Sequence, residues 1–235
     1  MNFDAIYADP PWSFKTWSDE GKDRSPENHY GCMSFADIEA LPITEIAADD
    51  CALFLWATDP LLPKALQLIE AWGFTYKTVA FVWAKLNKSA PKMMFSEKDF
   101  FTGLGYWTRA NPELCLLATR GKPQRVSKAV RRLVIAPRRE HSRKPDEVAD
   151  RIVQLMGDVP RIELFARETR DGWQAWGDEA HKFDTPQRGG ASPVADSSRG
   201  SADEARGSSS RSVPDGVPAA TSPGFSQAYN AASKR

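Results

Sequence analysis

Four consecutive residues, Asp9-Pro10-Pro11-Trp12, place a carboxylate, two prolines and an indole directly after a short apolar run at 3–8. The Asp9 carboxylate and the Pro10 carbonyl can accept hydrogen bonds, whereas prolines supply no N–H groups. Two acceptors directed at the N–H bonds of a nucleobase amine would oppose delocalisation of its lone pair into the ring. Trp12 could lie against the base, since base–aromatic stacking contributes about 1–3 kcal/mol. The motif therefore predicts methylation of an exocyclic amine by positioning and electrostatics, without a covalent intermediate.

The same four residues also have a simpler interpretation. Asp-Pro-Pro is a common way to end a strand and begin a loop, and Trp12 could be an anchor in the core. The position after an apolar run favours the chemical interpretation, because open α/β sheets bind ligands at the carboxyl ends of their strands.

The elements that must position this motif alternate along the chain. Apolar runs predict strands at 3–9, 51–58, 76–84, 113–119, 132–136 and 161–166. Apolar stripes and end signals predict helices at 60–72, at about 35–41 after Ser34, and from Pro145 onward. Alternating strands and helices predict an α/β fold, with a mostly parallel sheet and helices on both faces.

Composition divides the chain into a folded domain and a tail. Of the 51 residues in 185–235, 31 are Ser, Gly, Ala or Pro, which is too little apolar surface to support a core. We therefore expect one folded domain at 1–184 and a disordered tail at 185–235.

Charge is balanced overall but not locally. The formal net charge is zero, yet residues 120–144 hold ten Lys or Arg against one acid, Glu140. Such a stripe is typical of contact with a phosphate backbone, and a solvated basic loop is the alternative. The loops at 13–33, which contains Lys15, and at 85–111 combine basic and aromatic residues. That combination suits a flipped or single-stranded base.

Cysteine and histidine usage argues against disulfide and metal chemistry. The three cysteines, Cys32, Cys51 and Cys115, are widely spaced without a C-x-x-C pair. We expect buried free thiols and a reducing, cytoplasmic setting. With three scattered histidines we expect no metal, and we find no signal peptide or membrane span.

Further motifs accompany Asp9-Pro10-Pro11-Trp12 in a fixed order. They are Tyr30-Gly31-Cys32-Met33-Ser34, Leu53-Phe54-Leu55-Trp56, Gly105-Tyr106-Trp107, Glu113-Leu114-Cys115-Leu116, Lys144-Pro145-Asp146-Glu147 and Glu163-Leu164-Phe165-Ala166-Arg167. Together they resemble the MT-A70 family, the adenine-N6 methyltransferases related to the catalytic subunit of the mRNA adenosine methylase. The resemblance covers roughly residues 3–180 and implies a Rossmann-like methyltransferase fold in permuted motif order.

The resemblance also implies S-adenosylmethionine as methyl donor and a role for each matched residue. Asp9, Pro10, Pro11 and Trp12 would form the catalytic motif, with Asp9 touching both amine and cofactor. Lys144 would contact the carboxylate end of the cofactor and Arg167 its ribose, with Asp178 and Glu179 in a further cofactor block. The substrate pocket would be shaped by Tyr30, Trp56, Glu113 and Lys15.

Each carried-over role has a structural alternative. Lys144 could merely open its helix, Arg167 could form a surface ion pair, Trp56 could be core, and Glu113 could be an ordinary carboxylate at the start of a strand. Asp178 departs from the family, which commonly has Asn there; a carboxylate only accepts hydrogen bonds, whereas an amide also donates them.

These observations predict an S-adenosylmethionine-dependent adenine-N6 methyltransferase that acts on nucleic acid. DNA is favoured over RNA, because the chain is short and carries no appended RNA-binding domain. The alternatives are an RNA adenosine-N6 methyltransferase, a methyltransferase of another amine, and a catalytically inactive nucleic-acid-binding partner of the same fold. The sequence leaves monomer and homodimer equally open.

Overall fold

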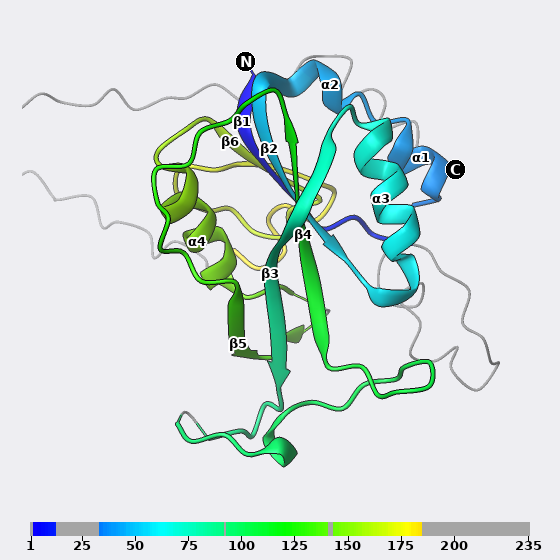
Figure 1. Cartoon of the computed structure of the whole chain (residues 1–235), viewed down its shortest axis with the longest axis vertical. Helices are drawn as coiled ribbons and strands as arrows, with labels where there is room; N and C mark the ends of the chain where they lie inside the picture. The colour runs from blue at the N-terminus through cyan, green and yellow to red at the C-terminus, as the bar shows by residue number, and fades with distance from the viewer. Residues whose placement is uncertain (1, 13–32, 92, 141–142, 185–235) are drawn as a thin grey trace, which may run out of the picture.

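The computed structural model describes residues 2–12, 33–91, 93–140 and 143–184, which form one twisted sheet covered by helices (Figure 1). Its seven strands have the order β5-β3-β4-β2-β1-β6-β7. Their bounds are β1 Phe3–Ala8, β2 Ala47–Ala57, β3 Thr75–Leu86, β4 Pro112–Arg120, β5 Leu133–Pro137, β6 Arg161–Leu164 and β7 Gln174–Trp176. The expected α/β class is confirmed and is consistent with a Rossmann-like methyltransferase fold.

The sheet is mostly parallel, as the sequence predicts. β1 is parallel to both β2 and β6, β6 to β7, and β3 to β5. Among the described strands, β4 alone is antiparallel, to β2 on one side and to β3 on the other. This reversal brings the first residues of β4 to the edge where the parallel strands end.

Helices cover both faces, which confirms the predicted layers. One face carries α1 (Phe35–Glu39), α2 (Ile43–Ile46) and α3 (Leu62–Ala71), and the other carries α4 (Asp146–Met156) (Figure 1). Side chains of β1 alternate between these layers: Ile6 packs with α1 to α3, and Tyr7 packs with α4. Strands that are buried on both faces have continuous apolar sequences, which explains why these strands could be predicted from the sequence.

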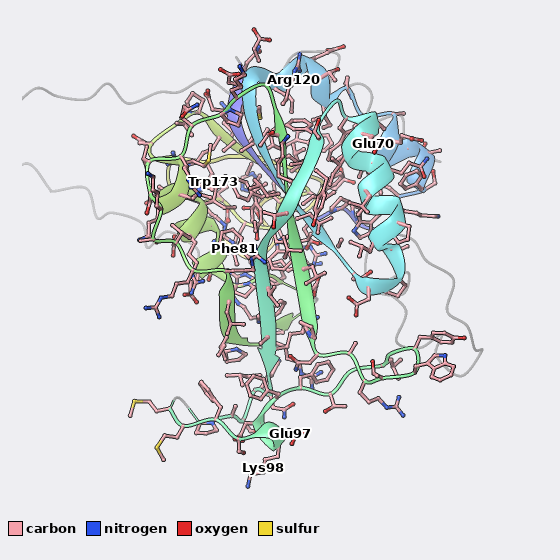
Figure 2. All side chains as sticks on the ribbon, in the orientation of Figure 1. Glu70, Phe81, Glu97, Lys98, Arg120 and Trp173 are labelled. Carbon is pink, nitrogen blue, oxygen red and sulfur yellow. The ribbon has the colours of Figure 1, made fainter. Side chains whose placement is uncertain are left out.

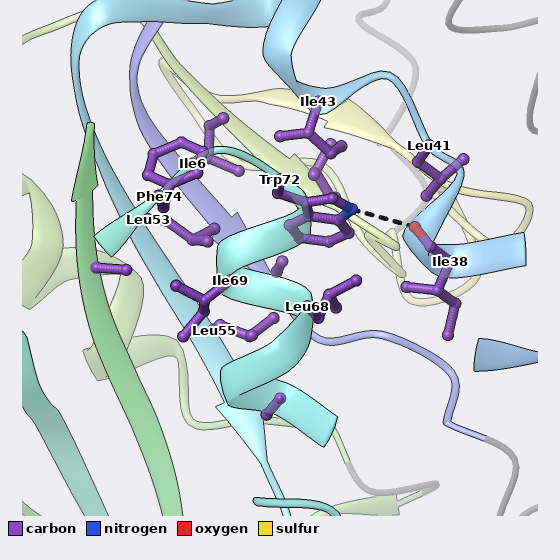
Figure 3. Close-up of a cluster of buried hydrophobic side chains, with 14 of the residues drawn as sticks. Ile6, Ile38, Leu41, Ile43, Leu53, Leu55, Leu68, Ile69, Trp72 and Phe74 are labelled. Carbon is purple, nitrogen blue, oxygen red and sulfur yellow. Dashed lines mark hydrogen bonds between the residues drawn. The ribbon is translucent and has the colours of Figure 1, made fainter. Parts of the chain in front are cut away.

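The core beneath α3 is mostly aliphatic, and the indole of Trp72 ties it to α1 (Figure 3). Trp72 is buried at the end of α3, and its Nε1 donates a hydrogen bond of 3.1 Å to the Ile38 carbonyl of α1. Gly73 follows with a φ of +79°, a conformation that a side chain would strain. The bond and the turn together hold α1 against α3.

Helix ends follow the sequence signals closely. The Ser34 hydroxyl accepts from the Asp37 N–H at 3.1 Å, as predicted for the start of α1. Pro145 is the N-cap of α4, and Gly157, with a φ of +82°, follows its end.

The helix expected at 60–72 begins instead with a 3-10 turn, η3 (Asp59–Leu61), before α3. The pattern missed β7 and α2, because elements of three or four residues are too short to show periodicity.

Residues 87–111, apart from residue 92, form an extension between β3 and β4 that we call the arm. It projects from the lower ends of both strands, and its labelled Glu97 and Lys98 lie far from Arg120 (Figure 2). The arm includes a short 3-10 turn, η4 (Glu97–Asp99), with a capping box from Ser96. None of the helices in the described residues is long and apolar enough to cross a membrane.

Candidate active site

Four charged side chains from separate parts of the sequence meet at one edge of the sheet. Asp9 follows β1, Lys85 is the second-last residue of β3, and Lys144 precedes α4. Glu113 is the second residue of β4 and reaches this edge because β4 is antiparallel. The chain thus assembles two carboxylates and two ammonium groups where parallel strands end, the usual ligand-binding edge of such sheets.

These four groups alternate in charge along a series of short contacts, Asp9–Lys144–Glu113–Lys85, which we call the charged chain. Lys144 Nζ lies 2.8 Å from Asp9 Oδ2 and 3.0 Å from Glu113 Oε1. Lys85 Nζ lies 2.6 Å from the other oxygen of Glu113, Oε2. Two positive and two negative charges therefore offset each other, which is what burial of ionised groups requires.

Burial differs along this chain. The side chains of Glu113 and Lys144 are only 5% and 7% exposed, whereas Asp9 retains 23%. Burial alone would raise the pKa of Glu113, but Lys144 and Lys85 lower it below its ordinary value. Burial alone would lower the pKa of Lys144, but Asp9 and Glu113 raise it well above its usual range. Both groups stay charged at neutral pH, and Asp9 is the more exposed of the two carboxylates.

The rings of two buried tryptophans lie against the two lysines of the site. The Lys144 ammonium lies 5.3 Å from the centroid of the Trp56 ring, and Lys85 lies 5.0 Å from that of Trp83. Trp56 is fully buried and its Nε1 donates to the Tyr7 hydroxyl at 2.7 Å. The structure thus gives Trp56 the core position that was its alternative, in direct contact with the charged chain.

The Asp9–Trp12 turn has its own internal hydrogen bonds. The Pro10 carbonyl accepts from the Trp12 N–H at 2.8 Å, and the Pro11 carbonyl accepts from the Met33 N–H at 3.1 Å. A carbonyl has a second lone pair, so Pro10 can still accept from a substrate amine. Trp12 is buried in the hydrophobic cluster with α1 to α3, and its Nε1 has no partner among the described residues. Stacking of Trp12 on a base stays a prediction.

Three of the predicted cofactor residues, Arg167, Asp178 and Glu179, follow β6, the strand that pairs with β1. Arg167 Nε is 3.7 Å from Glu179 Oε2, and Asp178 is exposed. Ala8 pairs with Leu164, so the segment after β6 emerges at the same edge as Asp9. Contact of Arg167, Asp178 or Glu179 with a cofactor stays a prediction. Tyr30 and Lys15 lie outside the described residues.

An ion-pair network that the sequence did not suggest joins β6 to α4. Arg170 contacts Glu163 at 3.0 Å, Glu168 at 2.5 Å and Asp146 at 2.8 Å. Arg143 also pairs with Glu168. Burial raises the pKa of Glu163 to about 7, with Arg170 opposing the shift and Glu168 and Asp9 adding to it. A carboxylate inside an apolar strand was the available sign that Glu163 matters.

The basic stripe separates into paired and exposed members. Arg139, Arg143 and Lys144 pair with acids at the site. The exposed members make no salt bridge among the described residues: Lys122, Arg125, Lys128, Arg131, Arg132 and Arg138. This second group has charge available for a phosphate backbone.

The arm exposes aromatic rings beside a cavity. Tyr106 and Trp107 are 88% and 93% exposed at its tip, and Trp107 has a φ of +70°. Near the base, a cavity of about 500 Å³ is lined by Phe101, Thr102, Gly103, Leu104, Arg109 and Arg138. The Arg138 guanidinium lies 4.1 Å from the Phe101 ring centroid. The lining contains two guanidinium groups and no acid.

Among the described residues no group of three or more His, Cys, Asp or Glu is arranged to hold a metal. The expectation that no metal takes part stays a prediction. Cys51 and Cys115 are buried free thiols, as predicted, whereas Cys32 lies outside the described residues.

The fold and the site define the class of protein. It is a Rossmann-like α/β protein with a charged site at the edge where the parallel strands end, and an Asp-Pro-Pro-Trp turn follows β1 at that edge. Residues 3–179 match the MT-A70 family, and the chain belongs to that family. The Type II methyltransferase M.MunI of Mycoplasma sp. is 34% identical over 207 residues, covering 80% of this chain and 82% of that protein.

Longer relatives match this chain over somewhat fewer residues. The N(6)-adenosine-methyltransferase MT-A70-like protein of Arabidopsis thaliana is 29% identical over 181 residues, covering 75% of this chain and 24% of that protein. The human N(6)-adenosine-methyltransferase catalytic subunit METTL3 is 29% identical over 167 residues, covering 70% of this chain and 26% of that protein. The chain thus spans about a quarter of these plant and human relatives.

Proposed function

We propose that this methyltransferase-family protein transfers a methyl group from S-adenosylmethionine to the N6 amine of adenine in DNA. The observation that carries the proposal is the position of Asp9. Its carboxylate stands at the carboxyl edge of the sheet, partly exposed and held by Lys144 at 2.8 Å. An acceptor fixed beside buried charges is preorganised for a reacting N–H group.

The residues at the β1 and β6 edge have the chemistry that S-adenosylmethionine requires. Lys144 and Arg167 could bind its carboxylate or ribose oxygens, and Glu163 and Glu179 could accept from its hydroxyl or amino groups. Lys144 and Lys85 together offset the charges of Asp9 and Glu113, so these four groups are neutral in sum before the cofactor, a sulfonium with its own carboxylate and ammonium, arrives. When bound, the cofactor supplies an electrophilic methyl group for in-line transfer.

Within the site, Asp9 accepts a hydrogen bond from the adenine amine, and the Pro10 carbonyl can accept the other. These bonds orient the nitrogen and limit delocalisation of its lone pair. Asp9 would also accept the amine proton that methylation releases, or pass it to solvent. Lys144 orients Asp9, while the buried Trp56 and Glu113 hold Lys144. Positioning supplies most of the acceleration.

The choice of DNA follows the relative whose match spans most of both chains, a type II methyltransferase. The exposed aromatics of the arm and the exposed basic residues would bind a base and its phosphates. RNA is the second candidate, since several relatives are named N(6)-adenosine-methyltransferases. A cytoplasmic location stays a prediction, and both monomer and homodimer stay open.

Methyl transfer to matched pools tests the proposal. The full chain is incubated with isotopically labelled S-adenosylmethionine and either PCR-amplified DNA or RNA transcribed from it, and nucleosides are then analysed by mass spectrometry. We expect labelled N6-methyldeoxyadenosine from DNA. Label confined to RNA supports the second candidate. Label on cytosine refutes adenine as the target, and no label on either pool, despite cofactor binding by calorimetry, indicates an inactive partner.

A further inference from the structure

Lys85 occupies the far end of the charged chain, and nothing in the motif assigns it a role. Its ammonium binds Glu113 at 2.6 Å but does not contact Asp9. Glu113 presents its other oxygen to Lys144, which in turn binds Asp9. The path of direct contacts from Lys85 to the reacting carboxylate therefore runs through Glu113 and Lys144.

We propose that Lys85 is a positioning residue for the proposed methyl transfer. By binding Oε2 of Glu113, it leaves only Oε1 for Lys144, so that the Lys144 ammonium remains directed at Asp9. The inference rests on the proposed function for its kinetic consequence, but the linkage of Lys85 to Glu113 can be measured without it.

Charge balance gives the physical reason. With Lys85 present, two ammonium groups offset two carboxylates. Without it, the buried Glu113 has one counter-cation and competes with Asp9 for Lys144, or it takes up a proton. Either response changes the partner of Asp9, because a buried unpaired carboxylate is costly.

The Lys85 side chain lies between the Trp83 ring and the Glu113 carboxylate. Its ammonium lies 5.0 Å from the Trp83 ring centroid, and Trp83 is buried with its Nε1 donating to the Ala136 carbonyl at 2.9 Å. A lysine fixed between an indole and a carboxylate gives up the rotamer freedom typical of a surface lysine. That arrangement suits a structural counter-charge.

The backbone of Lys85 has a separate function that side-chain variants retain. Its carbonyl accepts from the Phe101 N–H at 2.8 Å and from the Asn111 side-chain amide at 3.0 Å. These bonds fasten the arm to β3 at Phe101 and at Asn111. Replacement of the side chain leaves them possible, so we expect Lys85→Met to fold with its arm in place.

The first measurement is the titration of the Glu113 carboxyl carbon by nuclear magnetic resonance in the full-length chain, assigned with Glu113→Gln. The charged and titratable groups that face Glu113 are Lys85, Lys144, Asp9 and Cys115. Removal of one cation at hydrogen-bond distance should raise the Glu113 pKa by about one unit or more in Lys85→Met. Lys85→Arg should keep it low. The matched control is Lys88→Met, an exposed lysine whose partner Glu140 is also exposed.

The second measurement is the pH profile of methyl transfer to PCR-amplified DNA. Activity that needs ionised Glu113 falls as pH drops through its pKa, so Lys85→Met should move the acidic limb of kcat to higher pH. We expect kcat at neutral pH to fall about tenfold, KM to change little, and Lys85→Arg to restore most of the loss.

Two results would overturn the proposal. One is a Glu113 titration that is the same in Lys85→Met and in the wild type. The other is a raised KM and a weaker salt dependence with an unchanged kcat profile, which marks a phosphate contact instead. Should Lys85→Met fail to fold, the same change in a Glu113→Gln background decides: a further loss of kcat there contradicts action through Glu113. If the wild type methylates no nucleic acid, the proposed function fails, but the titration still tests the linkage.

Discussion

Asp9 and Lys144 are 135 positions apart in the sequence, yet Lys144 Nζ lies 2.8 Å from Asp9 Oδ2. Asp9 directly follows β1, and Lys144 stands just before α4, the helix that covers one face of the sheet. The contact fixes the orientation of the one carboxylate in the charged chain that solvent, and hence substrate, can approach. It makes Asp9 and Lys144 the two residues whose replacement should have the clearest and most different effects.

Replacement of Asp9 should affect turnover far more than stability. We expect Asp9→Ala to lower kcat at least about a hundredfold, the scale for losing one preorganised polar contact to a reacting group. Asp9→Asn, which keeps the shape and one acceptor, should lose less. Asp150→Asn on the exposed side of α4 is the control. Near-normal turnover of Asp9→Ala, with folding checked by circular dichroism, would refute the assigned role.

Replacement of Lys144 should affect stability as well. Lys144→Met leaves Glu113 with Lys85 alone and Asp9 without its cation, and breaking a buried pair costs about 3–5 kcal/mol. Urea unfolding measures this loss against Lys122→Met, an exposed lysine. The double variant Lys144→Met with Glu113→Gln should recover part of it. Equal losses in the single and double variants would show that the pair does not interact as described.

The sequence could predict those features that depend on residues close together in the chain. These features are the Asp9–Trp12 motif, the buried strands and the helices α1 and α4, because each depends on local residue types or on periodicity. The antiparallel direction of β4 was not visible. Strand direction depends on the connection through the arm, which has no periodic pattern.

The unpredicted direction of β4 explains why the pairing of Lys85 with Glu113 was not predicted. Glu113 could be named only by resemblance, and Lys85 was one lysine among several in a long segment. Their pairing depends on β3 and β4 lying side by side in opposite directions, so that the end of one meets the start of the other. Long-range pairs of this kind are set by topology, which residue spacing alone does not encode.

The raised pKa of Glu163 predicts a pH dependence of stability. Its folded-state pKa is about 7 against an ordinary value of 4.5, so the folded protein holds this proton where the unfolded chain has released it. The stability contributed by the neutral carboxyl is present below about pH 4.5 and is lost as pH rises toward 7. Glu163→Gln should remove this component from the dependence of Tm on pH.

The control for this experiment is Glu45→Gln, an exposed carboxylate on α2. Other carboxylates titrate over the same range, so the informative quantity is the difference in slope between each variant and the wild type. A slope that is unchanged by Glu163→Gln would contradict the idea that this carboxyl is protonated near neutral pH.

The exposed aromatic tip of the arm should matter for binding and not for folding. Tyr106 and Trp107 contact so little of the protein that Tyr106→Ala with Trp107→Ala should leave Tm nearly unchanged. Loss of base stacking, worth about 1–3 kcal/mol per base, should raise the Kd for single-stranded DNA about tenfold or more in fluorescence anisotropy. Met93→Ala, another exposed apolar residue of the arm, is the matched control. An unaltered Kd, or an equal rise in the control, would mean that the tip does not stack on bases, and the arm would then have no demonstrated part in holding the strand.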